Sequence, residues 1–339
     1  MIRRIRGSVR RLIRPALHGV DRHGWYAERW RAAAGASGWR VLRDEPPFVD
    51  LARSGVVLHT MGSDIGIDSH VTYRTAGNKS ETARRLLVAG IAAPESTEFD
   101  AIDVRGALRF LRRHPRPVVV KPAAGTGGGA GVTVGPDGTA MALRALRDEA
   151  AYSRRVAIEP AIDGRVVRVL VLRGRVLDAV HRAPAAVVGD GASSVGKLVD
   201  AENTRRSALG ALSTGFVGAG ADQLAALERA RSTRRSVPDV DARVVVAGRS
   251  NTGSEHESTR IAPTPSAADV ATRAADAVGV QLAGVDLVID GAGEPVAVLE
   301  VNTGPGLHWH VLVDGEAYDP FTAILDSLAD DPATGSTTT

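Results

Sequence analysis

The sequence predicts an α/β protein composed of α+β lobes, and three observations support this. Segments with helical character at 79–88 and 105–113 alternate with short apolar strands at 118–120 and 132–134. Longer stretches alternate apolar and polar residues on either side of a turn, as the strands of a hairpin do. The 339 residues are 44% hydrophobic and 24% charged, a composition typical of a globular chain with two domains or one large α/β unit.

The predicted elements can be placed in chain order. Residues 25–40 form a helix that ends at Gly38, and 56–59 form a short strand before a polar loop. Gly90 ends the helix that begins at Lys79. The later elements are a helix near 139–150, a strand at 156–158, a hairpin over 165–180, a helical stretch within 204–240, a helix capped at Ser266, and a hairpin of 283–290 and 295–302.

The composition excludes several classes of protein. The chain has no cysteine, which rules out disulfides, thiolate zinc sites, iron–sulfur clusters and cysteine nucleophiles. No stretch reaches the ~20 apolar residues of a membrane span, and the N-terminus lacks the apolar segment of a secretory signal. We therefore expect a cytoplasmic protein without a membrane span.

The formal net charge of +3 is unevenly distributed. Residues 1–14 hold six arginines and no acidic residue, so the rest of the chain carries −3. A nucleic-acid-binding protein is expected to carry its basic excess on the folded body, so we expect no nucleic-acid partner. The apolar residues of this arm recur at helical spacing, which favours a helix packed on its own domain over an amphipathic surface helix.

Only three of the 42 basic residues are lysines, namely Lys79, Lys121 and Lys197. A compact ammonium suits contact with a phosphate, although any single lysine can stand where it does by chance. The sequence of residues 191–197 has the form G-x-x-x-x-G-K, but Leu198 follows where a P-loop needs a hydroxyl for magnesium. We therefore reject a P-loop and expect Lys197 on the surface.

A glycine-rich segment begins directly after Lys121. It has five glycines within 125–131, so its backbone can approach an anion closely and its N–H groups can bind phosphate oxygens. Gly125, Gly127 and Ala130 formally match a dinucleotide fingerprint, but that motif must open a helix and residues 132–134 form a strand. A strand–loop–strand flap over a nucleotide fits better than either that motif or a plain surface hairpin.

The last hairpin has the pattern of a metal site. Glu300 and Asn302 are two residues apart and share a strand face, while Leu299 and Val301 are predicted to point into the core. Asp286 lies opposite Glu300 if the strands pair in the expected register. Two carboxylates and an amide oxygen suit Mg²⁺, although such a cluster alone is also common at solvated strand ends.

The motif His308-Trp309-His310 offers two candidate zinc ligands, but no third ligand stands at a diagnostic spacing. We expect a substrate-side or structural role for these residues. The sequence has no serine-nucleophile elbow and no H-E-x-x-H motif.

In this order, these segments resemble the ATP-grasp ligases, with greatest similarity to cyanophycin synthetase and the ATP-grasp part of bifunctional glutathione synthetases. The resemblance covers about residues 75–325 and includes the segments 182–191 and 237–253 typical of that branch. It implies an ATP-grasp fold with an N-terminal α/β lobe and two lobes that grip ATP. The expected divisions are a basic arm at 1–14, a substrate-side lobe at 15–77, an ATP-grasp region at 78–328 with a flap at 113–158 and a metal and catalytic lobe at 159–328, and a disordered tail at 329–339.

The resemblance also implies roles for individual residues. Lys79 and Lys121 would contact ATP phosphates beneath a closing loop that contains Gly125, Thr126, Gly127, Gly128 and Gly129. Adenine would meet Glu159, the Pro160 carbonyl and the Ile162 amide. Magnesium would be held by Asp286, Glu300 and Asn302, with two ions expected and manganese able to replace them.

The sequence departs from the family pattern at two positions. Val166 stands where many members place a carboxylate for the ribose, and Gly284 stands where D-alanine ligases place an arginine. Three arginines are candidates to stabilise the acyl phosphate in its place: Arg168, Arg182 and Arg260.

The implied function is an ATP- and Mg²⁺-dependent ligase that joins a small carboxylate, such as an amino acid or peptide, to an amine through an acyl phosphate. An ATP-grasp small-molecule kinase and a nucleotide-binding module without turnover are the alternatives. The partners are small-molecule substrates, and a homodimer remains open.

Overall fold

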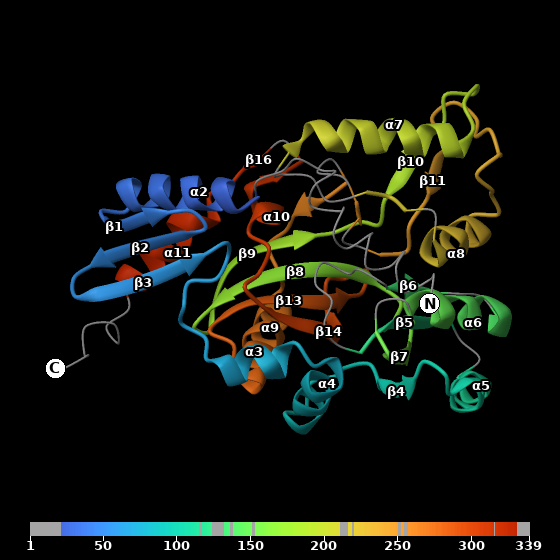
Figure 1. Ribbon diagram of the computed structural model, residues 1–339, viewed down its shortest axis with the longest axis horizontal. Coiled ribbons are helices and arrows are strands. Elements are labelled where there is room, and N and C mark those ends of the chain that lie inside the picture. The colour runs from blue at the N-terminus through green and yellow to red at the C-terminus, as the bar shows by residue number, and fades with distance from the viewer. Residues whose placement is uncertain are drawn as a thin grey trace.

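The structure is a computed structural model (Figure 1), and it describes residues 22–114, 117–123, 132–135, 138–150, 153–210, 216–218, 220–249, 252–253, 257–314 and 316–330. The predicted basic arm, glycine-rich loop and C-terminal tail beyond Asp330 lie outside these residues. None of the described helices is long and apolar enough to cross a membrane.

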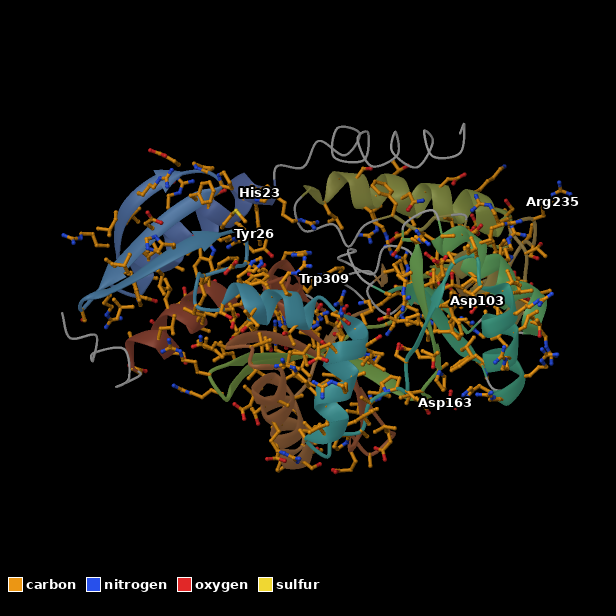
Figure 2. All side chains as sticks on the ribbon, turned by 60° about the horizontal axis from the view of Figure 1, so that its bottom comes forward. His23, Tyr26, Asp103, Asp163, Arg235 and Trp309 are labelled. Carbon is orange, nitrogen blue, oxygen red and sulfur yellow. The ribbon has the colours of Figure 1, made fainter. Side chains whose placement is uncertain are left out.

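The N-terminal unit is a helix packed on a small antiparallel sheet. Helix α2 (Arg22–Ala36) contacts the sheet β1 (Arg40–Glu45), β2 (Phe48–Arg53) and β3 (Val56–Met61). The C-terminal helix α11 (Pro320–Ala329) returns to this unit and packs on α2. Tyr26 and Trp30 of α2 both contact Phe321 of α11 edge-on, so both ends of the described chain share one core (Figure 2).

A second sheet has the strand order β4-β7-β5-β6. Its strands are β4 (Thr97–Asp100), β5 (Val118–Pro122), β6 (Thr133–Val134) and β7 (Arg155–Pro160). Helices α5 (Val104–Arg113) and α6 (Gly138–Glu149) share its apolar core. Strands β5 and β6 flank the glycine-rich segment, as the flap prediction requires of its two strands.

The largest sheet has five strands in the order β12-β9-β8-β13-β14. They are β8 (Arg165–Leu172), β9 (Arg175–His181), β12 (Thr259–Arg260), β13 (Leu282–Ile289) and β14 (Pro295–Thr303). Both predicted hairpins are confirmed, as β8–β9 and β13–β14. Helix α9 (Pro265–Val278) covers one face, and α3 (His70–Ala76) and α4 (Lys79–Val88) lie beside β14.

A smaller unit follows β9 and carries the long helix at the top of Figure 1. Its elements are β10 (Ala186–Val188), α7 (Val195–Ala208), α8 (Ala221–Arg229) and β11 (Arg243–Val245). The chain then returns to the large sheet and ends with α10 (His308–Val311), β15 (Leu312–Val313), β16 (Glu316–Ala317) and α11.

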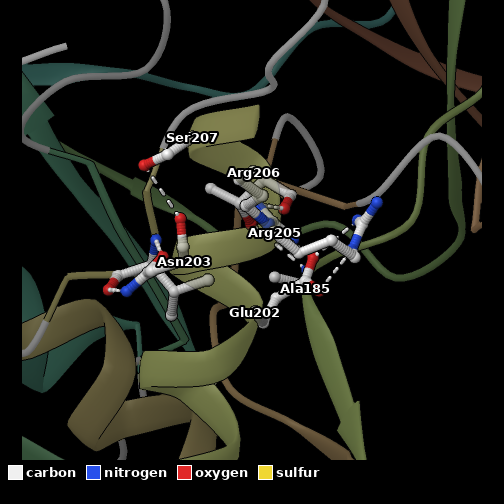
Figure 3. Close-up of polar contacts among 8 residues, drawn as sticks. Ala185, Glu202, Asn203, Arg205, Arg206 and Ser207 are labelled. Atoms are coloured by element: carbon white, nitrogen blue, oxygen red, sulfur yellow. Dashed lines mark hydrogen bonds and ion pairs between the residues drawn. The ribbon is translucent and has the colours of Figure 1, made fainter. Parts of the chain in front are cut away.

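Side chains on α7 hold the smaller unit together (Figure 3). Asn203 accepts a hydrogen bond from the Val217 amide at 2.9 Å and donates one to the Val217 carbonyl at 3.1 Å. Arg206 is fully buried and donates to Glu202 at 2.7 Å and to the Thr252 carbonyl at 2.6 Å. These contacts fix the segments that follow α7 and β11 against the helix.

Two local predictions were wrong. Helix α9 is capped by Thr264, whose side chain accepts from the Ala267 amide, because Pro265 occupies the first helical turn; Ser266 instead bonds Glu294. Leu299 is only half-buried, because the β13–β14 register shifts beside it.

Candidate active site

The predicted catalytic and metal residues of the last lobe gather on one face of the five-stranded sheet. Asp286 on β13 pairs directly with Glu300 on β14 and with Arg168 on β8, so the three side chains share a face. The neighbouring residues Val167 and Val169 on β8, Val285 and Leu287 on β13, and Val301 on β14 face the other way and belong to the core shared with α9. The period-two alternation of these strands therefore separates a polar site from an apolar core.

Lys79 reaches this face from the start of α4. Asn78 caps the helix by accepting from the Glu81 amide, which places Lys79 in the first turn. Its Nζ donates to Glu300 Oε1 at 2.5 Å. Burial favours the neutral form of Glu300, but the charge and hydrogen bond of Lys79, helped by Lys121, outweigh it and lower the pKa of Glu300 to about 2.

Arg168 binds Asp286 with two parallel hydrogen bonds. Its Nε donates to Oδ1 at 2.5 Å and its terminal nitrogen to Oδ2 at 2.7 Å, and both side chains are largely buried. Asn302 donates to the Gly284 carbonyl at 3.2 Å, which leaves its side-chain oxygen as an acceptor. Asp286, Glu300 and Asn302 therefore present oxygen atoms on one surface.

Gly284 leaves room for Arg168. A Cβ at position 284 would lie 3.1 Å from both the Cδ and a terminal nitrogen of Arg168. A larger residue at position 284 would therefore crowd the Arg168 side chain from the neighbouring strand.

The second lysine lies on the smaller sheet. Lys121 on β5 and Glu159 on β7 are diagonal neighbours on paired strands, and the Lys121 Nζ donates to Glu159 at 2.6 Å. Both side chains are buried. Lys121 also lowers the pKa of Glu300, and the charge of Glu159 acts on Lys79, so the two ion pairs are close enough to interact.

Pro160 and Ile162 lie in the connection between the two sheets. Pro160 is the last residue of β7, and the Ala161 amide donates to the Pro117 carbonyl at 2.8 Å. Gly164 then has a φ of 144°, and a Cβ there would lie 2.4 Å from a methyl of Val288. The chain can pass from one sheet to the other at this point only because residue 164 is glycine.

Arg182 differs from the other two candidate arginines because no carboxylate pairs with it among the described residues. It follows β9, is 4% exposed, and stacks on the Trp309 ring at 3.8 Å from the centroid. One terminal nitrogen is buried without a hydrogen-bond acceptor. Burial and the nearby charge of Arg168 lower the pKa of Arg182 to about 9.

Arg260 lies at the other edge of the sheet, on β12, and is already paired. It donates to Asp178 at 3.0 Å and to the His310 carbonyl at 2.7 Å. The structure therefore places Arg168 against Asp286, one of the predicted metal ligands, and Arg260 against His310. Sequence reasoning missed Asp178 and the stacking role of Trp309, and only the motif 308–310 gave a signal for either.

Lys197 lies on the exposed surface of α7, as predicted, and Ser194 caps that helix. Glycines 125 and 127–129 and Thr126 lie outside the described residues. No group of three or more histidine, aspartate or glutamate side chains forms a metal cluster in the part of the chain that the structure describes, so a metal at Asp286 and Glu300 would need the Asn302 amide and non-protein ligands.

The chain was compared with known proteins. No family model matches the sequence. The glutathione biosynthesis bifunctional protein GshAB of Desulfotalea psychrophila is 26% identical over 292 residues, which cover 83% of this chain and 37% of that protein. Cyanophycin synthetase of Synechocystis sp. is 29% identical over 264 residues, which cover 74% of this chain and 30% of that protein.

The crystal structure of a bifunctional glutathione synthetase from Pasteurella multocida has the same fold. It superposes with a TM-score of 0.54 and 23% identity over 88% of this chain and 42% of that one. The chain thus shares the fold of this glutathione synthetase and is similar in sequence to GshAB and cyanophycin synthetase. The predicted fold class and family are thereby confirmed, and this ATP-grasp chain spans about a third of the length of the curated relatives it matches.

Proposed function

We propose that this ATP-grasp chain is an ATP- and Mg²⁺-dependent ligase that forms an amide bond between a small carboxylate, such as an amino acid or peptide, and an amine. The observation that carries the proposal is the buried guanidinium of Arg182, which has no carboxylate partner among the described residues and directly follows β9 of the sheet that holds Asp286 and Glu300. A cation left without a carboxylate partner inside a protein is costly unless an anion binds there. An acyl phosphate supplies that anion.

The donor set fits magnesium. Asp286, Glu300 and the Asn302 side-chain oxygen would hold it, together with phosphate oxygens and water. The ion, with a second one beside it, would neutralise charge on the transferring phosphoryl group. Lys79 and Lys121 would also neutralise the negative charge of the phosphoryl group.

The ion pairs of Lys79 and Lys121 support a way in which ATP would bind. The Nζ atoms of Lys79 and Lys121 each donate a hydrogen bond to a glutamate oxygen, at 2.5 and 2.6 Å. Both lysines would exchange that glutamate for a phosphate oxygen of ATP. Adenine would bind at Glu159, Pro160 and Ile162, beside the connection between the sheets. Arg182, with Arg168, would then orient the carboxylate and stabilise the acyl phosphate formed from it.

We assign the substrate-side lobe to 15–77 and the ATP-grasp region to 78–328, with the flap at 113–158 and the metal and catalytic lobe at 159–328. The sheet β1–β3 lies within 15–77 and the five-stranded sheet lies within 159–328, in support of this division. Helix α11, however, packs on the N-terminal unit, and β4 and α5 share the core of the sheet that holds β5–β7.

Nucleotide product analysis tests the proposal. Purified protein is mixed with MgATP and with pools of amino acids and dipeptides, and ADP, AMP and phosphate are quantified. We expect ADP and phosphate only when both a carboxylate and an amine are present. ADP without phosphate would indicate a kinase, AMP would refute an acyl phosphate, and tight ATP binding without turnover on any pool would favour a binding module.

A further inference from the structure

The short helix α10 carries a buried histidine, His310, that is hydrogen-bonded to an aspartate and an arginine. His310 Nδ1 lies 2.7 Å from Asp178 Oδ2, and Arg260 donates to the other oxygen of the same carboxylate at 3.0 Å. Arg260 also donates to the His310 backbone carbonyl at 2.7 Å. Asp178 on β9 therefore holds the imidazole of His310 at Nδ1, and Arg260 on β12 holds the His310 backbone.

These contacts define which nitrogen of His310 carries the proton. The Asp178 carboxylate accepts from Arg260, and an ionised carboxylate can only accept, so Nδ1 of His310 is the protonated nitrogen. Nε2 then carries a lone pair. It is buried and has no hydrogen-bond partner among the described residues. A buried acceptor without a donor is unusual in a folded protein, and a bound substrate can supply the donor.

His310 is close to the proposed site. Arg182 stacks on Trp309, the residue before it, which lies at the middle of the molecule in Figure 2. Asp178 pairs with Leu170 on β8, two residues from Arg168, so it shares the face that carries the metal-type residues. Arg168 and Arg182 are both near enough for their charges to act on His310.

The charged and titratable groups around His310 keep it neutral before substrates bind. Burial, with the charges of Arg168 and Arg182, lowers its pKa, while Asp178 opposes this. His308, Tyr318 and Glu316 are further titratable groups near this cluster: burial lowers the pKa of His308 well below the usual range, and Arg260 contacts both Tyr318 and Glu316. Bound phosphates would offset the two arginines and raise the basicity of His310 when a proton has to be accepted.

We propose that His310 is the general base that deprotonates the attacking amine, with Asp178 and Arg260 as positioning residues. This rests on the proposed ligase function, because only a ligase needs a neutral amine. Most amines are ammonium ions at neutral pH and have no lone pair for attack.

The attacking ammonium loses two protons when it becomes an amide. The ammonium gives one proton to Nε2 of His310, and the freed nitrogen lone pair forms the C–N bond to the acyl carbon. The C–O bond to the phosphoryl group then breaks, and phosphate leaves with that electron pair and with the second nitrogen-bound proton. The imidazolium is stabilised by Asp178 and returns its proton to water after the product leaves.

Two nucleophiles separate this role from a structural one. The wild-type chain is given MgATP, the pools of amino acids and dipeptides and, in one arm, hydroxylamine, and the newly formed peptides and hydroxamates are both quantified. Hydroxylamine is mostly unprotonated at neutral pH, so it attacks an acyl phosphate without a base. We expect His310→Gln to lower the ratio of new peptide to hydroxamate by about a hundredfold, and raising the pH should restore the ratio.

Asp178→Asn provides a second, nearly isosteric variant if His310→Gln fails to fold. It should lower the same ratio, because an amide can present a donor to Nδ1 and reverse the tautomer. His23→Gln, at an exposed position on α2, is the matched control and should leave the ratio unchanged. Thermal unfolding of each variant confirms that it is folded.

The outcomes are distinct. Loss of both products in parallel, or an unchanged ratio in His310→Gln and Asp178→Asn, would overturn the role of His310 while leaving the ligase intact in the wild type. A wild-type chain that forms neither hydroxamate nor new peptide would instead overturn the proposed function itself.

Discussion

Replacing Arg182 by methionine should stabilise the unliganded chain while it abolishes turnover. Burial and the charge of Arg168 lower the pKa of Arg182 to about 9, and each pKa unit corresponds to about 1.4 kcal/mol. The charged guanidinium is therefore disfavoured in the folded chain by roughly 5 kcal/mol, for a fall of the pKa from 12.5 to about 9. Its stacking on Trp309 returns about 1–2 kcal/mol, which leaves a net cost of about 3 kcal/mol.

Arg168→Met is the matched comparison and should have the opposite effect. Arg168 is paired with Asp286 by two hydrogen bonds, so its removal leaves a largely buried carboxylate without a partner. Breaking such a pair costs about 3 kcal/mol. Two arginines fourteen residues apart, on the same sheet, thus differ in the sign of their effect on stability.

Thermal unfolding without nucleotide, metal or phosphate measures the difference. Arg182→Met should unfold roughly 2–5 °C above the wild type, and Arg168→Met several degrees below it. An Arg182→Met chain that is less stable than the wild type would refute the reasoning that this guanidinium is a binding cation without a structural partner.

The remaining predictions concern other parts of the site. Lys121→Ala and Glu300→Ala should abolish ADP release with the fold intact by circular dichroism, whereas Lys197→Ala should retain full activity; equal loss in all three would reopen the P-loop interpretation. Because Lys79 lowers the pKa of Glu300 to about 2, their ion pair should stabilise the fold fully above the ordinary glutamate pKa and lose this effect as the pH falls toward 2. The difference in melting temperature between wild type and Glu300→Gln should therefore shrink as the pH is lowered from 6 to 3, and a constant difference would contradict that pairing. Gly164→Ala should lower the melting temperature by several degrees, because a Cβ there meets the neighbouring strand at 2.4 Å; an unchanged value would show that the connection can shift.

Strand alternation made much of the catalytic sheet predictable. The hairpins, and the pairing of Asp286 with Glu300, follow from apolar residues at every second position, because a slip by one residue would expose the buried face; the bulge at Leu299 is the part that this alternation did not predict. The predicted surface position of Lys197 followed from the hydroxyl that its motif lacks. In both cases the deciding signal lies within a short segment of the chain.

Long-range partners could not be predicted in this way. Lys79 and Glu300 are 221 residues apart, and Arg260 and Asp178 are 82 apart, so only the folded chain shows which cation meets which carboxylate. The three candidate arginines were equivalent in the sequence, and only burial and pairing distinguish Arg182 from the other two. Likewise, the motif 308–310 could not reveal that His310 rests on Asp178.

Transfer of oxygen from the carboxylate to phosphate tests the central claim most directly. Amino acids labelled with oxygen-18 in the carboxylate are incubated with the chain and MgATP, and the released phosphate is analysed by mass spectrometry. An acyl-phosphate ligase leaves one labelled oxygen in each phosphate that accompanies an amide bond. Unlabelled phosphate would show simple ATP hydrolysis, and label recovered in AMP would show adenylation; either result would contradict the proposed mechanism.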